Sequence, residues 1–390
     1  MNKNLLPLTL GGLGIGITEF VMMGLLPDIA KDLAITIPQA GYLISAYALG
    51  VVIGAPLLVS IAGKYPPKKI LIVLMILFTV FNAFSAFAPT FNTLFVARLL
   101  SGLPHGAFFG VGSVVASRIA EKGKAAQAVS LMFAGLTIAN IIGVPLGTFI
   151  GHHFSWRFSF AIVVFVGLIT LWSLKALLPA LPASENRDLK KELGFFKKQD
   201  AWIIIFMISI GTGGLFTWYS YISPLMTTVA GFSANSVTYI LMLAGMGMMV
   251  GNFFGGYLAD RFSPAKASAT LLLVMVLTLI IVHYVSFNPI LALVMTFITG
   301  AVSFALAAPI QMLMINTAKG SEMIAASVSQ ASFNIGNALG AFFGGLPLVY
   351  GYDYTSPASV GAAMAFIGAL FAFWLILKSS VLKRYELSKA

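Results

Sequence analysis

The sequence of 390 residues contains no cysteine, which excludes a disulfide framework and a thiolate metal site. Charged residues are also scarce: they make up 9% of the chain, against roughly 25% in a typical soluble domain. The four histidines are scattered and no two have the spacing of metal ligands. No phosphate-binding Gly-Lys-Ser/Thr loop occurs, which argues against ATP use by this chain. We therefore expect neither a bound metal nor a cofactor.

Apolar residues are what the chain has in abundance, at 59% of the sequence. A soluble protein of this length has no core large enough for them, whereas lipid solvates the outer face of a membrane protein. Runs of about 20 apolar residues recur, each long enough to cross roughly 30 Å of hydrocarbon as a helix. The predicted fold is therefore an all-α membrane protein of about twelve transmembrane helices. We predict them near residues 5–28, 40–62, 69–89, 92–117, 125–150, 157–179, 201–224, 235–259, 266–286, 290–315, 323–348 and 359–380.

One connection near the middle of the chain is longer and more polar than the others. It divides the sequence into a predicted six-helix bundle at 1–179, a cytoplasmic linker at 180–199 and a second six-helix bundle at 200–390. Orientation follows from the basic residues. With a cytoplasmic N-terminus, all of the 23 lysines and arginines fall on the cytoplasmic side except Lys31, Arg98 and Arg157. This bias predicts that both termini are cytoplasmic, and it accounts for the net charge of +11 without a nucleic acid partner.

The two halves carry matching loops. Lys64-Tyr-Pro-Pro-Lys68-Lys69 follows the second predicted span, and Arg261-Phe-Ser-Pro-Ala-Lys266 follows the eighth, 197 residues later. Lys122-Gly and Lys319-Gly repeat at the same offset. Both matches together indicate duplicated six-helix units. Parallel repeats of this kind are typical of secondary transporters whose substrate site lies between the repeats near the membrane midplane.

Several motifs resemble the major facilitator superfamily over nearly the whole chain. Gly256-Tyr-Leu-Ala-Asp260-Arg261 resembles the loop signature Gly-x-x-x-Asp-Arg, although Gly63 stands where the first-half copy would have its acid. Arg98-Leu-Leu-Ser-Gly102 resembles the fourth-helix motif, and Gly143-Val-Pro145-Leu-Gly147 a shortened antiporter motif. The resemblance implies that the loop residues Gly63, Lys64, Lys68, Lys69, Gly256, Asp260 and Arg261 act in gating.

Four further stretches narrow the resemblance to bacterial twelve-helix drug:proton antiporters of the sugar-efflux and chloramphenicol-resistance type. They are Thr18-Glu19-Phe20 with Gly24-Leu-Leu-Pro27, Pro104-His105-Gly106-Ala107-Phe108, Trp156-Arg157, and Tyr221-Ile-Ser-Pro224. What this implies is proton-driven export of a small molecule by alternating access from a bacterial inner membrane, by a protein that is a monomer in the family's usual state. Composition and spacing alone do not give the direction.

Glu19 is the only one of the twelve acidic residues that lies well inside a predicted span. An ionised acid at mid-helix costs about 2.5–3.5 kcal/mol on insertion scales, so such a residue is a functional candidate by default. It either pairs with a cation or binds a proton, and a carboxyl that alternates between the two is what proton coupling requires. A satisfied structural acid is the alternative.

Arg98 and His105 are the basic candidates for the same path. Glu19 lies eight residues before Pro27, which puts it about 12 Å below the outer face, and Arg98 lies at about 10 Å on the fourth span. We therefore expect Arg98 to be the direct partner, with His105 about 21 Å deep on the same helical face. Arg98 could instead be purely structural, and His105 could be a neutral histidine bonded to a backbone carbonyl.

The second half has no intramembrane carboxylate, so we expect it mainly to recognise cargo. Polar residues also hold membrane helices together, which is the alternative reading. The predicted substrate-binding residues are Tyr47, Phe108, Phe109, Asn140, Trp218, Tyr219, Tyr221, Gln311, Gln330, Asn334 and Asn337. Aromatic and methionine residues suit an amphipathic, loosely specified ligand.

Three functions remain open on this basis, besides a channel-like pore, against which the duplicated halves argue. The first is a proton-coupled exporter, and the second is a proton-coupled importer or facilitator, against which the antiporter-like motif argues. The third is a membrane-embedded enzyme, which would need an acid–base cluster at the membrane surface. We expect His152 and His153 to have no acid nearby, so an enzyme is not expected. The expected partners are protons, a small molecule and the lipid bilayer.

Overall fold

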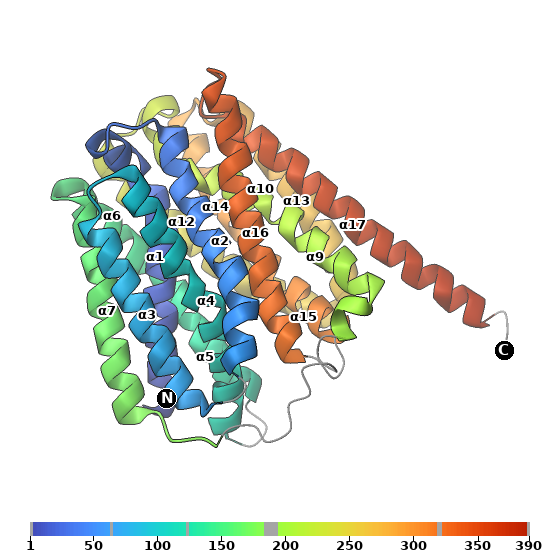
Figure 1. Ribbon diagram of the computed structural model, residues 1–390. Coiled ribbons are helices and arrows are strands. Elements are labelled where there is room, and N and C mark those ends of the chain that lie inside the picture. Colours follow the sequence, from blue (N-terminus) through green and yellow to red (C-terminus); the bar gives the residue numbers. More distant parts are fainter. Residues whose placement is uncertain (1–2, 63–64, 122–124, 183–193, 318–321, 388–390) are drawn as a thin grey trace.

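The computed structural model describes residues 3–62, 65–121, 125–182, 194–317 and 322–387, for some of them the backbone alone. Regular structure in these residues is helical throughout, without a strand (Figure 1). The first half contains seven α-helices, a short 3-10 turn and a π-helical turn. They are η1 (Lys3–Leu5), α1 (Leu6–Asp32), α2 (Ile37–Ala62), α3 (Pro67–Phe87), α4 (Phe91–Ile119), α5 (Ala125–Ile138), η2 (Ala139–Gly143), α6 (Val144–His153) and α7 (Trp156–Leu177).

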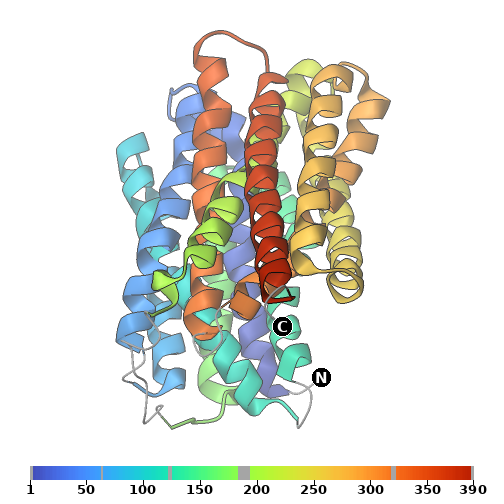
Figure 2. The same ribbon diagram turned by 90° about the vertical axis from the view of Figure 1, so that its right-hand side faces the viewer.

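The second half begins after the predicted linker, most of which lies outside the described residues. Its elements are η3 (Gly194–Lys197), α9 (Gln199–Gly211), α10 (Gly213–Ser220), α11 (Ile222–Pro224), η4 (Leu225–Val229), η5 (Ala234–Ser236), α12 (Val237–Arg261), α13 (Pro264–Val285), α14 (Pro289–Ala305), α15 (Ala307–Thr317), α16 (Glu322–Val349) and α17 (Ser356–Leu387). The helices run alongside one another in both views (Figures 1 and 2). Both chain ends lie toward one end of the bundle, which we call the terminal end, and we call the opposite end the far end.

Eleven helices among the described residues are long and apolar enough to cross a membrane. Each of them lies on a predicted span, for example Pro67–Phe87 and Trp156–Leu177. The eleventh predicted span is occupied by α16, which is long enough at 28 residues but is not among these eleven. Its sequence is rich in serine and asparagine as well as apolar residues. The predicted all-α membrane fold is therefore confirmed.

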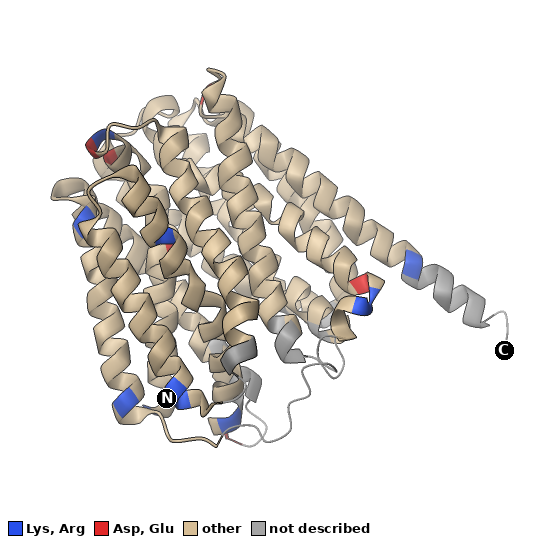
Figure 3. Ribbon diagram, viewed as in Figure 1, with Lys and Arg blue, Asp and Glu red and all other residues tan. Residues whose placement is uncertain are grey.

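The outer surface of the bundle is apolar where a soluble protein would be polar. Phe165, Phe253 and Leu277 are each at least 60% exposed, and many other large apolar side chains share this surface. Exposed apolar area on this scale marks contact with another apolar phase, here lipid. Figure 3 shows charged residues gathered near the two ends of the helices, with very few along the middle. This is the distribution that a hydrocarbon layer imposes.

The two halves meet along two seams. On one side α2 packs against α16, where the Ser45 hydroxyl donates a hydrogen bond of 2.9 Å to the carbonyl of Ala338. On the other side α6 and η2 pack against α12. There Gly245 lies so close to the Asn140 carbonyl that an added Cβ would be 2.6 Å from its oxygen. Backbones approach this closely in membranes because small residues leave the room.

The first span of each half contains a proline at an equivalent position, but the helix is continuous at one of them and interrupted near the other. Pro27 and Pro224 are separated by the repeat offset of 197 residues. The first helix, α1, continues through Pro27 to Asp32, four residues beyond the predicted span. Its counterpart is interrupted at Tyr221, whose φ and ψ are −112° and 18°, and widens into the π-helical turn η4 after Pro224. Only the second half therefore has a joint at this position.

Candidate functional site between the two halves

Glu19 lies on the buried face of α1, 5% exposed, where α1 packs closely against η2 and α6. Two glycines of the antiporter-like motif make this packing possible. A Cβ added at Gly143 would overlap Ile17, and one added at Gly147 would come within 2.8 Å of Val21. The chain therefore contacts α1 two residues before Glu19, from the end of η2, and two residues after it, from α6. Pro145 stands between these glycines, in the first turn of α6.

Arg98 of α4 is fully buried and bonds to the neighbour of Glu19 rather than to Glu19. Its Nη1 donates a hydrogen bond of 2.9 Å to the Thr18 hydroxyl, which in turn donates one of 2.6 Å to the side chain of Asn82. The Asn82 amide nitrogen donates back to the carbonyl of Phe78. Arg98 Nε and Nη2 have no hydrogen-bond partner.

The guanidinium of Arg98 also lies over an aromatic ring. Its central carbon is 4.3 Å from the centroid of Tyr47, a cation–π contact in a site from which water is excluded. The Tyr47 hydroxyl is 3.2 Å from Nδ1 of His105, which is itself buried. The structure thus brings Arg98, Tyr47 and His105 together in one buried cluster, with Glu19 nearby.

The expected direct ion pair is not formed. Within the described residues no carboxylate oxygen of Glu19 comes within 4.0 Å of a nitrogen of Arg98 or His105. Counting residues along two helices gives their relative depth, but not their rotation or tilt, and Thr18 rather than Glu19 faces the guanidinium. His105 is reached through Tyr47 instead of a backbone carbonyl.

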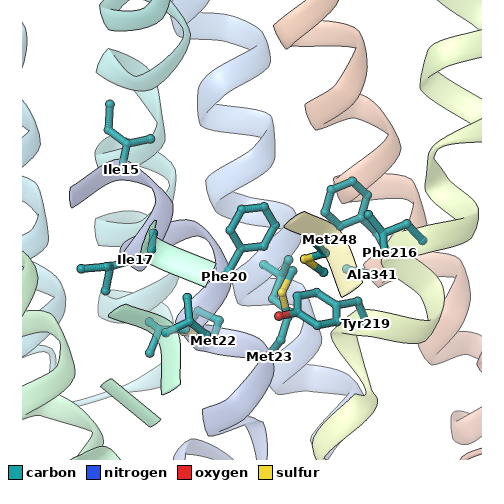
Figure 4. Packing of buried hydrophobic residues seen from close by; sticks show 14 of the residues in the cluster. Ile15, Ile17, Phe20, Met22, Met23, Phe216, Tyr219, Met248 and Ala341 are labelled. Carbon is teal, nitrogen blue, oxygen red and sulfur yellow. The ribbon is translucent and has the colours of Figure 1, made fainter. Parts of the chain in front are cut away.

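Phe20, the residue after Glu19, packs into an aromatic and methionine wall that includes residues of the second half. Phe20 is stacked on Phe216 at 6.5 Å between ring centroids and meets the edge of Tyr219 at 6.2 Å. Figure 4 shows Met23 and Met248 gathered in the same place. These residues come from α1, α10 and α12, so the wall crosses the boundary between the halves.

Polar atoms without partners lie along this wall. The Tyr219 hydroxyl, Trp218 Nε1 and the side-chain oxygen of Asn334 are buried and make no hydrogen bond. Asn337 faces the Glu19 carboxyl from α16. The two groups fall outside hydrogen-bond geometry, because neither amide atom of Asn337 has a partner at normal distance and angle. Buried polar groups are nearly always satisfied, so each of these is a candidate for binding something the chain does not supply.

Other predicted cargo residues lie in packing roles. Phe108 fills the space beside Gly11, and Phe109 is stacked on Phe133 at 5.0 Å, both inside the first half. Asn140 donates to the carbonyl of Leu136 and leaves its own oxygen unpaired. In α16, Gln330 supplies the carbonyl that accepts a hydrogen bond from Asn334.

The remaining two predicted cargo residues each bond within the second half. Gln311 accepts a hydrogen bond of 3.0 Å from the Ser329 hydroxyl. Tyr221 donates to the carbonyl of Ala341.

The predicted gating loops are described only in part. Lys68 Nζ donates to the carbonyls of Lys175 and Leu178, which joins the start of α3 to the end of α7. Lys69 lies exposed on the same turn. Gly63 and Lys64 lie outside the described residues, and for Gly256, Asp260 and Arg261 only the helical backbone of α12 is described.

A polar cluster at the far end escaped the sequence analysis. Nδ1 of His152 is 2.9 Å from a carboxylate oxygen of Asp28, so the expectation that His152 has no nearby acid is wrong. Asp32 accepts hydrogen bonds from Trp156 and Arg157, at 3.0 Å and 2.5 Å. These acids lie on α1 and their partners some 125 residues later, so no local spacing reveals them. The cluster ties the end of α1 to the turn between α6 and α7.

Comparison with known proteins identifies the family and the relatives of the chain. A family model described as Major Facilitator Superfamily matches residues 8–326. The chain is 41% identical to the inner membrane transport protein YdhP of Escherichia coli, over 96% of each, and 38% identical to the Escherichia coli protein AraJ, over 94% of this chain and 93% of AraJ.

Solved structures share the fold at low sequence identity. A D-xylose–proton symporter matches with a TM-score of 0.78 at 17% identity, over 95% of this chain and 96% of that one. A bacterial homologue of the lysosomal transporter Spinster, inward-facing and occupied, matches with a TM-score of 0.74 at 16% identity over the same shares. With its span pattern and these bacterial relatives, the chain is a multi-pass membrane transporter rather than an enzyme, and it belongs to the major facilitator superfamily.

Proposed function

We propose that the protein exports a small organic molecule in exchange for protons, by alternating access between its halves at 1–179 and 200–390. Both termini are then cytoplasmic, in a bacterial inner membrane, because the basic residues gather on the terminal side. One observation carries this proposal. Glu19 is the buried carboxyl at the boundary between the halves, beside a buried arginine to which it is not bonded.

The absence of an ion-pair bond is what suits Glu19 to carry a proton. A carboxylate held by two parallel N–H groups of an arginine is fixed in its charged form by a short, charge-assisted interaction. Here Thr18 and the ring of Tyr47 hold Arg98, whose Nε and Nη2 make no hydrogen bond. Arg98 is thus close enough to favour the ionised carboxyl without locking it. Glu19 is free to release a proton and to take one up again.

The cargo class follows from the aromatic and methionine wall around Phe20, the residue next to Glu19. Phe20, Phe216 and Tyr219 offer apolar faces, and the methionines beside them adapt to ligands of different shape. The unpaired Tyr219 hydroxyl, Trp218 Nε1 and Asn337 amide supply a few polar contacts. Mostly apolar surroundings with a few convergent polar groups suit a small amphipathic molecule, such as a drug or a modified sugar.

The second candidate is a proton-coupled importer or facilitator. Its support is the D-xylose–proton symporter among the structural matches, a likeness of fold alone at 17% identity. Export is favoured by the glycines Gly143 and Gly147, which give the antiporter-like motif its close contact with α1 on both sides of Glu19.

Transport in proteoliposomes with an imposed pH gradient tests the proposal. Wild type, Glu19→Gln and the control Asp32→Asn, a second α1 carboxyl, are compared on a panel of sugars and amphipathic antibiotics. We expect cargo to move against the proton flow in wild type and in the control. Glu19→Gln is expected to retain exchange of cargo and to lose the drive by the gradient.

Each other outcome removes a defined part of the proposal. Movement of cargo with the proton flow would establish import and overturn the direction. A Glu19→Gln variant driven as well as wild type would overturn the role of Glu19, and His105 would be the next residue to test. An unchanged rate with and without the gradient would leave a facilitator.

A further inference from the structure

Tyr221 occupies the joint of the second half and is fully buried there. Its hydroxyl donates a hydrogen bond of 2.7 Å to the carbonyl of Ala341 in α16. Cargo contact was expected of this residue, but its one polar atom already has a partner. Its surroundings indicate a different role.

The hydroxyl of Tyr221 lies in a notch between two glycines. A Cβ added at Gly41 of α2 or at Gly345 of α16 would overlap the Tyr221 Oη, well inside the 3.0 Å that Cβ atoms keep from other atoms. The oxygen therefore occupies the room that two side chains would need. Gly345 belongs to the same half as Tyr221, whereas Gly41 belongs to the other half. We call this notch the Gly41–Gly345 socket.

The socket is part of the seam between α2 and α16. One turn further along α2, Ser45 bonds to the carbonyl of Ala338. Tyr42, next to Gly41, is stacked on Phe342 at 5.8 Å between ring centroids. Contacts between the halves thus surround the Tyr221 hydroxyl along this seam, toward the far end of the bundle.

We propose that Tyr221 is a gating residue whose hydroxyl seats in the Gly41–Gly345 socket when the halves are closed at the far end. Its bond to Ala341 and its contact with Gly345 lie within the second half, so they persist when the halves separate. Only the wall formed by Gly41 moves away. Gly41 has no side chain because the closed state needs that space. This inference rests on the proposed alternating access of the two halves, but not on proton coupling or on the identity of the cargo.

The test uses the chain's lack of cysteine, because Ser223→Cys then provides a single reactive thiol. Ser223 is 3% exposed in α11, which packs on α1, so its thiol reacts only when the far end opens. The rate of reaction with a bulky maleimide is measured on purified protein in detergent. In this background we expect Gly41→Ala to raise the rate about tenfold, because overpacking of this size disfavours the closed state.

Two further variants distinguish an effect on gating from a general disturbance of packing by the added methyl group. Gly14→Ala is the matched control, since its added methyl meets only Val166 and Phe78 of its own half, at 3.2 Å and beyond, and it should react at the wild-type rate. Tyr221→Phe removes the oxygen from the socket, after which the nearest ring carbon is 3.1 Å from the Gly41 methyl. We therefore expect Gly41→Ala with Tyr221→Phe to react like Tyr221→Phe alone.

The proposal fails if Gly41→Ala folds and reacts at the wild-type rate, or if adding Tyr221→Phe leaves the fast reaction unchanged. Should Gly41→Ala alone not yield folded protein, the double variant decides. Recovery of folded protein with the slow rate of Tyr221→Phe supports the socket, whereas no recovery overturns it. Because no cargo or pH gradient enters the assay, its result is independent of the transport experiment on Glu19.

Discussion

Thr18 accepts a hydrogen bond of 2.9 Å from the buried Arg98 and donates one of 2.6 Å to Asn82. Replacing Thr18 by valine removes both bonds with almost no change in the shape of the side chain. Arg98 Nε and Nη2 already lack partners. Thr18→Val therefore leaves the whole guanidinium without a hydrogen bond in the interior of the bundle.

The magnitude follows from the two bonds lost. A hydrogen bond to a charged group is worth about 1.5–3 kcal/mol in soluble proteins, and one between neutral side chains in a membrane protein averages about 0.6 kcal/mol. The membrane value is low because the unfolded chain in lipid also finds partners. The cation–π contact with Tyr47 remains in the variant. We expect Thr18→Val to lower the free energy of unfolding by about 2 kcal/mol.

The assay is reversible unfolding in mixed micelles titrated with SDS, followed by circular dichroism. Thr9→Val is the matched control, the same change on the same helix. The Thr9 hydroxyl donates a hydrogen bond of 2.9 Å to the carbonyl of Leu131. Thr9→Val therefore loses only a bond between neutral groups and should lower the free energy of unfolding by about 0.6 kcal/mol. If Thr18→Val costs no more than Thr9→Val, the charge-assisted bond contributes nothing measurable and the reasoning about Arg98 is refuted.

Two further predictions concern Tyr47 and Asp353. Tyr47→Phe should lower the free energy of unfolding by about 1 kcal/mol, because the hydrogen bond to His105 is lost. Tyr47→Leu should lower it by about 1–2 kcal/mol more, because Arg98 also loses the aromatic ring beneath it. Equal losses for the two variants in the same SDS titration would contradict the cation–π contact. Hydrogen bonds from the Thr355 hydroxyl and backbone lower the pKa of Asp353 below its ordinary 3.8. The stability from Asp353 is then present above that pH and lost as the pH falls through the folded pKa, so Asp353→Asn should flatten the acid side of a stability curve below about pH 4. Parallel acid curves for the two proteins would count against this.

Composition predicts the scaffold well because lipid imposes a simple rule on every span. A helix such as α7 at Trp156–Leu177 follows from about 20 apolar residues between polar ends, whatever its neighbours are. The same rule singles out Glu19 and Arg98, since a charged residue inside a span is conspicuous. These features depend on the local sequence alone.

Contacts between helices are where sequence reasoning stops. Depth along α1 and α4 suggested a bond between Glu19 and Arg98, but helix rotation brings Thr18 to the guanidinium instead. The pair of Asp28 and His152 joins residues 124 apart in the sequence, so no local spacing reveals it. Asn82 could have been noticed as an isolated amide within the third predicted span. Its partner could not, because rotation and tilt are set by packing.

The difference between the helices at Pro27 and Pro224 has a consequence for the kinetics of the proposed transport cycle. Two identical halves would resist bending equally, and the barrier to opening would be shared between them. Here α1 is a continuous strut braced by Arg157 and His152, while its counterpart is jointed at Tyr221. Deformation concentrates where the helical hydrogen bonds are already interrupted. If the halves alternate as proposed, we expect the first half to move as a rigid body and the slow step of opening at the far end to be set by a few residues around one joint of the second half.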